Sequence, residues 1–500
     1  MMNDNRKSDS SIVPKKPANK PAPEAGAELV EGRRLVKGNE LGEDTLRTPR
    51  REESWSVFKR IRLAAKEQRL MTSLYHVVYN ETQLRAAYYR LKRKAAAGID
   101  GVSWAQYGEQ LEENLKALAE RLARRGYRPP AARRVYIPKP DGRQRALGIL
   151  AVADKVVQYV VACILSAIWE AEFLGFSYAY RPRRSVHDAL DALTVGLTRR
   201  PINWILDADI RAYFDTISHE WLKKFIEYRV GDRRLLALIE KWLKAGVMEE
   251  GSWRASEMGT PQGGVVSPVL ANIYLHYVFD QWANQWRKRR ARGAMIMVRY
   301  ADDIVVGFEY REDAEQFRQE LSTRLAQFSL TLNEDKTRLI EFGRQAARRR
   351  KQRGEGKPET FNFLGFTHIC GQTRKGKFQV IRHTMRKRMQ AKLKDLKQEM
   401  RRRMHQRLRE QGEWVAAVLR GHYQHYGVPL NSRALGSFTY RVGRLWLRTL
   451  QRRSQKARTL SWEKFRRITA RWTPAGCIRH PYPFVRLANR LAVCESSVTV

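Results

Sequence analysis

The stretch VRYADDIVV, residues 298–306, decides the fold prediction, because two apolar β-rich runs flank a small residue and two adjacent carboxylates. Runs rich in β-branched and aromatic residues favour strands, and aspartate tolerates turn geometry. We therefore expect a β-hairpin that presents Asp302 and Asp303 at its turn. Aspartates are common at such turns for structural reasons alone, so the pattern by itself leaves a structural and a catalytic role open.

A second β-rich run, WILDADI at residues 204–210, supplies a third carboxylate, Asp209, at a predicted strand end. Three carboxylates offer hard oxygen ligands for two Mg²⁺ ions about 3.5 to 4 Å apart, which clamp the attacking hydroxyl and the leaving pyrophosphate of a nucleotidyl transfer. We expect Asp209, Asp302 and Asp303 to be catalytic and to bind two Mg²⁺ ions, for which Mn²⁺ is expected to substitute. Asp207 lies one pleat repeat back and is interpreted as structural.

The charge of the chain indicates a polyanionic partner. Lys and Arg number 95 against 52 Asp and Glu in 500 residues, a net charge of +43. Residues 374–458 carry +20 of this charge, with 24 basic and four acidic residues, so nucleic acid is the expected partner. The four cysteines lack disulfide or zinc spacing and fit a reducing cytosol. The most apolar run, residues 156–169, is too short and too polar to predict a membrane span.

Hydrophobic periodicity predicts an α+β fold. Residues 1–54 are polar and poor in aromatics, so we interpret them as a flexible N-terminal tail. The basic residues 344–356 are expected to form a solvated loop, and Asn431 is expected to cap a helix that follows it. Helical spacing is found at residues 109–122, 220–247, 268–290, 385–408 and 414–426.

The YADD motif together with Asp209 resembles the palm of reverse transcriptases, and the surrounding blocks resemble group II intron-encoded reverse transcriptase/maturases. These blocks are AGIDGV (97–102), RVYIPKPDG (134–142), MGTPQGGVVSP (258–268), LNEDKT (332–337) and FLGF (363–366). The resemblance runs from about Trp55 to the end and implies a right-hand polymerase followed by an α-helical thumb. The implied domains are a tail at 1–54, fingers and palm at 55–368, a thumb/maturase domain at 369–455 and a short basic DNA-binding domain at 456–500.

The resemblance also implies a nucleotide pocket. Lys139 and Arg145 would hold the incoming triphosphate, Gln262 would lie against the new base pair, and Phe214 would exclude a ribose 2′-hydroxyl and so favour dNTPs. Cations opposite the metal ions suit a tetra-anionic nucleotide. Read alone, Lys139 fits a solvated turn and Phe214 fits a core aromatic, so both roles depend on the resemblance.

A basic stripe marks the predicted thumb. Arg441, Arg444, Arg448 and Arg452 recur at spacings of 3, 4 and 4 with no acid between them, and we interpret them as an RNA-binding face rather than a merely solvated one. The expected partners are a group II intron RNA, an RNA template with its DNA primer, target DNA and dNTPs.

The resemblance therefore implies an RNA-directed DNA polymerase that binds its intron RNA, assists splicing and copies the intron into DNA during retrohoming. The chain is similar to bacterial members of the family that lack the HNH endonuclease, so second-strand cleavage is not expected. The bacterial cytosol or nucleoid is the expected location. Two alternatives stay open: a splicing cofactor without essential polymerase activity, and a domesticated or defence reverse transcriptase.

Overall fold

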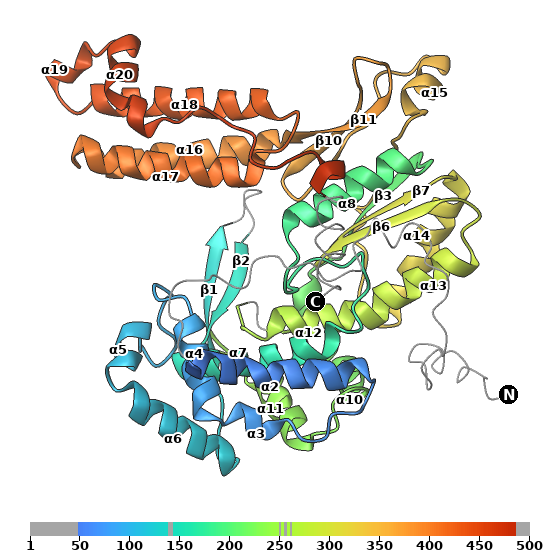
Figure 1. Ribbon diagram of the computed structural model, residues 1–500, viewed down its shortest axis with the longest axis vertical. Coiled ribbons are helices and arrows are strands. Elements are labelled where there is room, and N and C mark those ends of the chain that lie inside the picture. Colours follow the sequence, from blue (N-terminus) through green and yellow to red (C-terminus); the bar gives the residue numbers. More distant parts are fainter. Residues whose placement is uncertain (1–48, 139–143, 250–251, 255–257, 261–262, 487–500) are drawn as a thin grey trace.

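The computed structural model describes residues 49–138, 144–249, 252–254, 258–260 and 263–486. Figure 1 shows a helical body at the bottom, a central sheet at the right and a bundle of long helices across the top. This mixture of helices and antiparallel sheets confirms the α+β prediction.

The lower body is built from the N-terminal helices and a small sheet. Its first helix begins five residues before the predicted end of the N-terminal tail. The elements are α2 (Pro49–Lys66), α3 (Tyr75–Val78), α4 (Glu81–Arg90), α5 (Trp104–Glu109), α6 (Leu111–Ala123), β1 (Ala132–Pro138), β2 (Gln144–Ile149) and α7 (Val152–Trp169). Strands β1 and β2 form an antiparallel hairpin, and β4 (Val247–Glu249) and β5 (Ser252–Arg254) complete the order β2-β1-β4-β5.

Helix α7 is the core of this body. It has 18 residues because it begins at Val152, ahead of the apolar run that the sequence analysis judged too short. By length and composition it is the one helix of the described residues that could cross a membrane, with a mean hydropathy of 1.5. Two thirds of it is buried, however, and it packs against α2 and α4, as the core helix of a globular body does.

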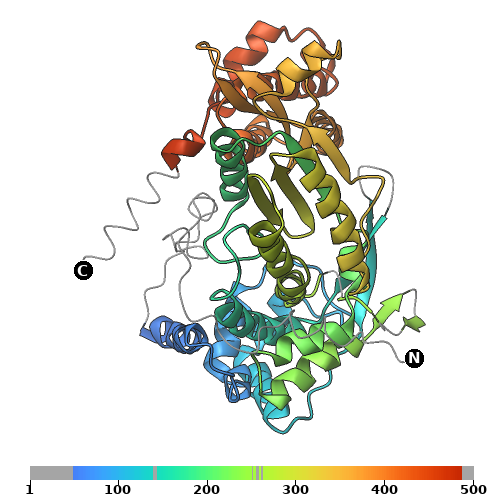
Figure 2. The same cartoon turned by 90° about the vertical axis from the view of Figure 1, so that its right-hand side faces the viewer.

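The central sheet has the order β6-β7-β3-β8 and is antiparallel throughout. Its strands are β6 (Met295–Tyr300), β7 (Asp303–Phe308), β3 (Trp204–Asp209) and β8 (Arg338–Glu341). Helix α8 (Val186–Arg199) covers one face and α14 (Arg311–Ala326) the other, so that the sheet lies between two helical layers (Figure 2). Burial on both faces explains why β6 and β7 read as nearly continuous apolar runs.

Between the strands lie α9 (Tyr213–Thr216) and two pairs of helices. The expected helix at 220–247 is two helices, α10 (His219–Glu227) and α11 (Arg233–Lys244), because Asp232 caps α11 by accepting hydrogen bonds from the amides of Arg234 and Leu235. The expected helix at 268–290 is continuous but contains a π-turn. It comprises α12 (Ser267–Leu275), the π-helical η2 (His276–Asp280) and α13 (Gln281–Arg289).

The segment after β8 departs from the sequence expectation. Residues 344–356 contain a helix, α15 (Ala346–Gln352), where a loop was expected, because Ala346 is buried while basic side chains stay at the surface. A three-stranded antiparallel sheet follows, formed by β9 (Phe361–Phe363), β10 (Phe366–Gln372) and β11 (Phe378–Thr384).

The upper bundle consists of three long helices and a short C-terminal group. These are α16 (Arg386–Arg402), α17 (Leu408–Tyr426), α18 (Ser432–Gln451), α19 (Gln455–Arg458), α20 (Trp462–Thr469) and η3 (Ala470–Trp472). The helix expected at 385–408 ends at Arg402, because the buried amide of Gln411 donates to the carbonyls of Arg403, Met404 and Gln406 and fixes a turn there. Phe465 and Trp472 are buried in the same core as the three long helices.

Asn431 precedes α18, as expected, but its side chain does not cap the helix. It is fully buried and exchanges hydrogen bonds with Thr384 at the end of β11, at 3.1 Å to the amide and 2.9 Å to the hydroxyl. The residue therefore joins the bundle to the small sheet.

Candidate active site

The predicted hairpin is present, and its turn lies at the end of the central sheet. Tyr300 pairs with Asp303 across β6 and β7, which leaves Ala301 and Asp302 as a two-residue turn. Ala301 adopts a left-handed backbone conformation with φ of 59°, a region that L-residues other than Asn and Asp visit rarely. The turn sends Asp302 and Asp303 to one end of the sheet.

The third predicted carboxylate stands directly opposite. Asp209, the last residue of β3, pairs in register with Asp303, the first residue of β7. Strand pairs of this kind bring the two Cβ atoms to about 4.5–5.5 Å. The structure therefore brings together all three acids that the sequence analysis selected, from segments 93 residues apart, with Asp302 adjacent in the turn.

Block LNEDKT, residues 332–337, holds Asp209 from the other side. The carboxylate Oδ2 accepts a hydrogen bond from Asn333 Nδ2 at 2.9 Å and an ion-pair contact from Lys336 Nζ at 2.7 Å. The amide of Asn333 also donates to the Asp209 carbonyl at 2.8 Å. The sequence analysis recognised this block but gave its residues no role. A basic residue in an otherwise polar turn carried no local signal for one.

Like charges are concentrated at this end of the sheet. Burial, followed by the charge of Asp302, raises the pKa of Asp303 to about 7. Asp209 and Asp207 act in the same direction, and Arg388 of α16 opposes them. Burial also raises the pKa of Asp207 to about 6, and this side chain faces Arg338 at 3.9 Å, in keeping with a structural role. A cluster of carboxylates that repel one another at neutral pH is an arrangement that a cation stabilises.

The donor set has the right chemistry for Mg²⁺, since carboxylate oxygens are the hard ligands this ion takes. Among the described residues, however, no three His, Cys, Asp or Glu side chains are already arranged as a metal-binding group. The ammonium of Lys336 contacts the Asp209 oxygen that would face an ion. The backbone thus brings the three acids to one end of the sheet, whereas their side chains are not already arranged to coordinate a cation.

The predicted nucleotide-binding residues are only partly described. Lys139 and Gln262 lie outside the described residues, and Arg145 is placed by its backbone on β2, opposite Ile137. Phe214 lies in α9, half-buried, and its carbonyl accepts a hydrogen bond from Thr260 at 2.8 Å.

Two glycines show how closely this region is packed. A Cβ on Gly259 would lie 2.8 Å from the Phe214 carbonyl oxygen, and one on Gly263 would lie 2.4 Å from that of Gly148 in β2. Of the described residues in the MGTPQGG block, Gly259 therefore packs against α9 and Gly263 against β2, the elements that carry Phe214 and Arg145.

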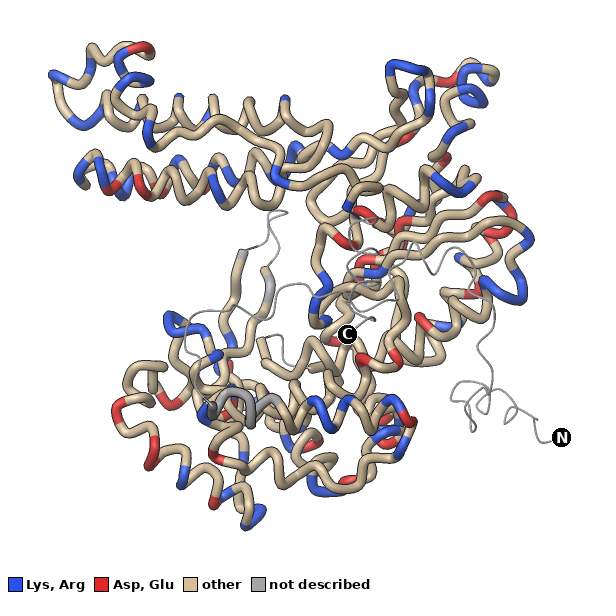
Figure 3. Tube along the Cα trace, in the orientation of Figure 1, with Lys and Arg blue, Asp and Glu red and all other residues tan. Residues whose placement is uncertain are grey.

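The basic stripe of α18 is divided by the structure. Arg441, Arg448 and Arg452 are exposed, whereas Arg444 is half-buried with its guanidinium 5.5 Å from the ring centre of Trp462. Figure 3 shows that Lys and Arg recur along the whole upper bundle and over α15. The three exposed arginines are available to an anion, and Arg444 is engaged in packing.

A helical lower body, a sheet with paired acids and a helical bundle above it define the right-hand polymerase class, as expected. The family described as reverse transcriptase (RNA-dependent DNA polymerase) matches residues 137–368, which include β2, the central sheet and β9. Protein YkfC of Escherichia coli strain K12 is 34% identical over 327 residues, which are 57% of this chain and 86% of YkfC.

The chain therefore belongs to the group II intron reverse transcriptase/maturases and is by class an RNA-directed DNA polymerase. The group II intron-encoded protein LtrA of Lactococcus lactis subsp. cremoris is 34% identical over 224 residues, 44% of this chain and 37% of LtrA. Among solved structures, the match with a telomerase from Candida albicans covers 80% of this chain and 69% of the telomerase chain, with a TM-score of 0.38 and 11% identity.

Proposed function

We propose that this chain extends a DNA primer on an RNA template by nucleotidyl transfer at Asp209, Asp302 and Asp303. The observation that carries the proposal is the direct pairing of Asp209 with Asp303 across β3 and β7, beside the Asp302 turn. Carboxylates that lie this close together and repel one another fit a site that is complete only with divalent cations.

Asp209, Asp302 and Asp303 would hold two Mg²⁺ ions in this proposal, with Mn²⁺ as a substitute. The ions would supply charge neutralisation at the transferred phosphoryl group and activation of the primer hydroxyl. Asn333 orients Asp209 by its hydrogen bond, and Lys336 forms an ion pair with the same carboxylate. The chain thus provides the ligands and a cation that compensates their charge.

The same proposal gives the nucleotide a place. Lys139 and Arg145 would bind the triphosphate, Gln262 would contact the new base pair, and Phe214 would exclude the 2′-hydroxyl so that dNTPs are preferred. The close packing of Gly259 and Thr260 against α9 and of Gly263 against β2 supports this set.

We further propose that the natural substrate RNA is a group II intron whose splicing the chain assists and which it copies into target DNA. The likeness to LtrA and the excess of +20 in residues 374–458 support this role. Arg441 and Arg448 of α18, and Arg452 directly after it, are exposed cations available to such an RNA. Residues 456–500 would contact DNA, and the chain would act in the bacterial cytosol or nucleoid.

Primer extension on an RNA template tests the catalytic proposal. Asp209→Asn and Asp303→Asn should each lower the extension rate at least about 10³-fold, while RNA affinity is retained, because only metal coordination is removed. The matched control is Asp207→Asn, which removes a carboxylate from the same strand face one pleat repeat away and should keep extension within a few-fold of wild type. Extension at wild-type rates by either of the first two variants would contradict the site assignment.

A further inference from the structure

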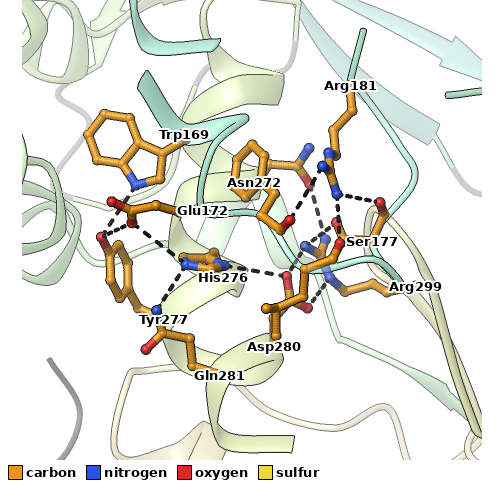
Figure 4. A network of polar contacts seen from close by, with 12 residues as sticks. Trp169, Glu172, Ser177, Arg181, Asn272, His276, Tyr277, Asp280, Gln281 and Arg299 are labelled. Atoms are coloured by element: carbon orange, nitrogen blue, oxygen red, sulfur yellow. Dashed lines mark hydrogen bonds and ion pairs between the residues drawn. The ribbon is translucent and has the colours of Figure 1, made fainter. Parts of the chain in front are cut away.

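One completely bonded side chain near the candidate active site was passed over by the sequence reasoning. Arg299, in β6, is fully buried, and all five of its guanidinium N–H groups have an acceptor. Its Nε and Nη2 donate to the two oxygens of Asp280, both at 2.6 Å. Nη2 also donates to Ser177 Oγ at 2.7 Å, and Nη1 to Asn272 Oδ1 at 3.1 Å (Figure 4).

The fifth hydrogen bond reaches the turn itself. Arg299 Nη1 donates to the carbonyl oxygen of Ala301 at 3.1 Å. This carbonyl belongs to the peptide that joins Ala301 to Asp302, and Ala301 has the left-handed backbone of the turn. A guanidinium that is fixed at four other points therefore holds the orientation of the peptide from which Asp302 departs.

Each acceptor is in turn fixed by its own element. Asp280 is the last residue of the π-turn η2, where the amide of Gln281 donates to the carbonyl of His276. Asn272 of α12 donates to the carbonyl of Ala179 at 2.6 Å. Ser177 lies in a segment that pairs with β6, since the amide of Arg299 donates a hydrogen bond to the carbonyl of Phe176 at 2.8 Å.

A buried ion pair of this kind is a weak source of net stability, because desolvation of the two charges offsets most of their attraction. A planar guanidinium with five directed donors is, by contrast, an effective means of fixing geometry. The arrangement is therefore better explained by the position that it imposes on the turn than by the energy that it contributes.

We infer that Arg299 is a positioning residue for the Ala301–Asp303 turn and that Asp280 is its orienting partner. The inference rests on the proposed function, because it assigns the turn's carboxylates to the polymerase site. Arg299 acts only through the peptide of Ala301 and does not itself contact a substrate.

The chain contains a matched control. Arg181 and Glu170 form a second buried ion pair in the same region, with side chains 2% and 8% exposed and Nη2 2.8 Å from Oε1. Arg181 Nη1 also donates to the carbonyls of Leu174 and Ser177, at 2.7 and 2.8 Å. These acceptors all lie within residues 170–177. Ser177 is bonded by both arginines, Arg181 at its carbonyl and Arg299 at its hydroxyl, but only Arg299 bonds Ala301, so replacing Arg181 tests burial and charge without that bond.

Arg299→Lys keeps the positive charge, but an ammonium lacks the planar set of donors with which the guanidinium bonds Asp280 and Ala301 at the same time. We expect it to lower kcat for single-nucleotide extension about 30- to 100-fold, with the dNTP KM within twofold, as a displaced catalytic group does. Arg181→Lys should keep kcat within about threefold. Ser177→Ala removes one of the five bonds with little change in volume and should lower kcat about 3- to 10-fold, which keeps the test informative should Arg299→Lys fold poorly.

Hydrogen exchange of the full-length protein without substrate gives a second readout that does not need polymerisation. The amides of residues 301–304 should exchange at least tenfold faster in Arg299→Lys than in wild type, and at the wild-type rate in Arg181→Lys. Equal reductions of kcat in the two lysine variants, or unchanged exchange at the turn in Arg299→Lys, would overturn the inference. A wild-type protein that extends no primer would instead defeat the proposed function, and the exchange rates would still decide the positioning role.

Discussion

His368 shows how a single buried side chain ties the stability of the small sheet to pH. It lies in β10, fully buried and stacked on Phe361 with ring centres 4.7 Å apart. Burial lowers the pKa of His368 to about 3, and the nearby charge of Arg382 acts in the same direction. The folded protein therefore keeps this imidazole neutral where an unfolded chain, with a histidine pKa of about 6.5, would protonate it.

Replacement by an uncharged ring should remove this pH dependence. Below pH 6.5 the unfolded chain binds the extra proton, so wild-type stability falls as pH falls, until the folded pKa of about 3 is reached. Lowering the pH from 7 to 5 should reduce the free energy of unfolding of wild type by about 2 kcal/mol more than that of His368→Phe. Urea unfolding at the two pH values measures this difference. A pH dependence in His368→Phe identical to that of wild type would show that this group does not change its protonation on unfolding.

Residues differ in how far the sequence alone predicts their position. The place of Asp302 and Asp303 at a hairpin turn was predictable because a strand–turn–strand pattern is local in the sequence. Arg299 was not, because its partners Asp280, Asn272 and Ser177 lie 19, 27 and 122 residues away. The signal that the sequence does carry is an arginine inside an apolar strand, since a charge at such a position requires a buried partner.

At the scale of elements, the basic stripe of helix α18 contains both exposed arginines and one arginine engaged in packing. Arg441, Arg448 and Arg452 are exposed, and Arg444 stacks on Trp462 of α20. Replacing the three exposed arginines with Gln should flatten the dependence of log K for RNA on log salt. The slope should change by up to about 0.9 for each phosphate no longer neutralised on a duplex, or 0.7 on a single strand. Splicing stimulation should fall further than extension on a short primer–template, because only a folded RNA reaches the outer face.

Arg444→Gln is the matched control on the same helix. It should leave the salt slope unchanged and lower the melting temperature, because it removes a cation–π interaction worth about 0.5–1 kcal/mol at a partly exposed site. Filter binding over a series of salt concentrations separates the two variants. If the triple variant binds with the wild-type slope, α18 is merely solvated and the RNA-binding surface lies on another element.

Element boundaries were the part of the fold that sequence periodicity predicted least well. The helix expected at 385–408 was too long because its end depends on Gln411 of the next helix, whose side-chain amide bonds three carbonyls in the turn. The loop expected at 344–356 was wrong because a run of charges conceals the single buried Ala346 that anchors α15. In both cases a tertiary contact decides where the helix begins or ends.

At the scale of the whole molecule, one acidic position on α8 joins three distant parts of the chain. Asp191 accepts from Arg382 of β11 at 2.8 Å and from Arg486 near the end of the described residues at 3.0 Å. Arg486 also bonds Asp188 at 2.7 Å. Helix α8, the small sheet and the C-terminal segment therefore meet at Asp191.

Removing the shared acid should cost more than removing one of its partners. Asp191→Asn leaves Arg382 buried without its counter-charge and should lower the free energy of unfolding by about 3 kcal/mol. Arg486→Gln leaves the Arg382–Asp191 pair intact and should cost about 1 kcal/mol or less. Urea titrations give both values, and equal effects would mean that Asp191 is not the point where the three parts are held.

The π-turn η2 has a consequence for comparing this chain with its relatives. A π-turn accommodates one residue more than the α-helix around it, and each residue of an α-helix advances the direction of its side chain by about 100°. Deleting one residue of His276–Asp280 would therefore convert the segment to regular α-helix without rotating α13 against the sheet, and would redirect by that angle only side chains within the former π-turn. Homologous sequences should therefore show either the same spacing between α12 and β6 or a single-residue gap at this place. Where the gap occurs, the acidic partner of the strand arginine should be missing from the helix or shifted along it.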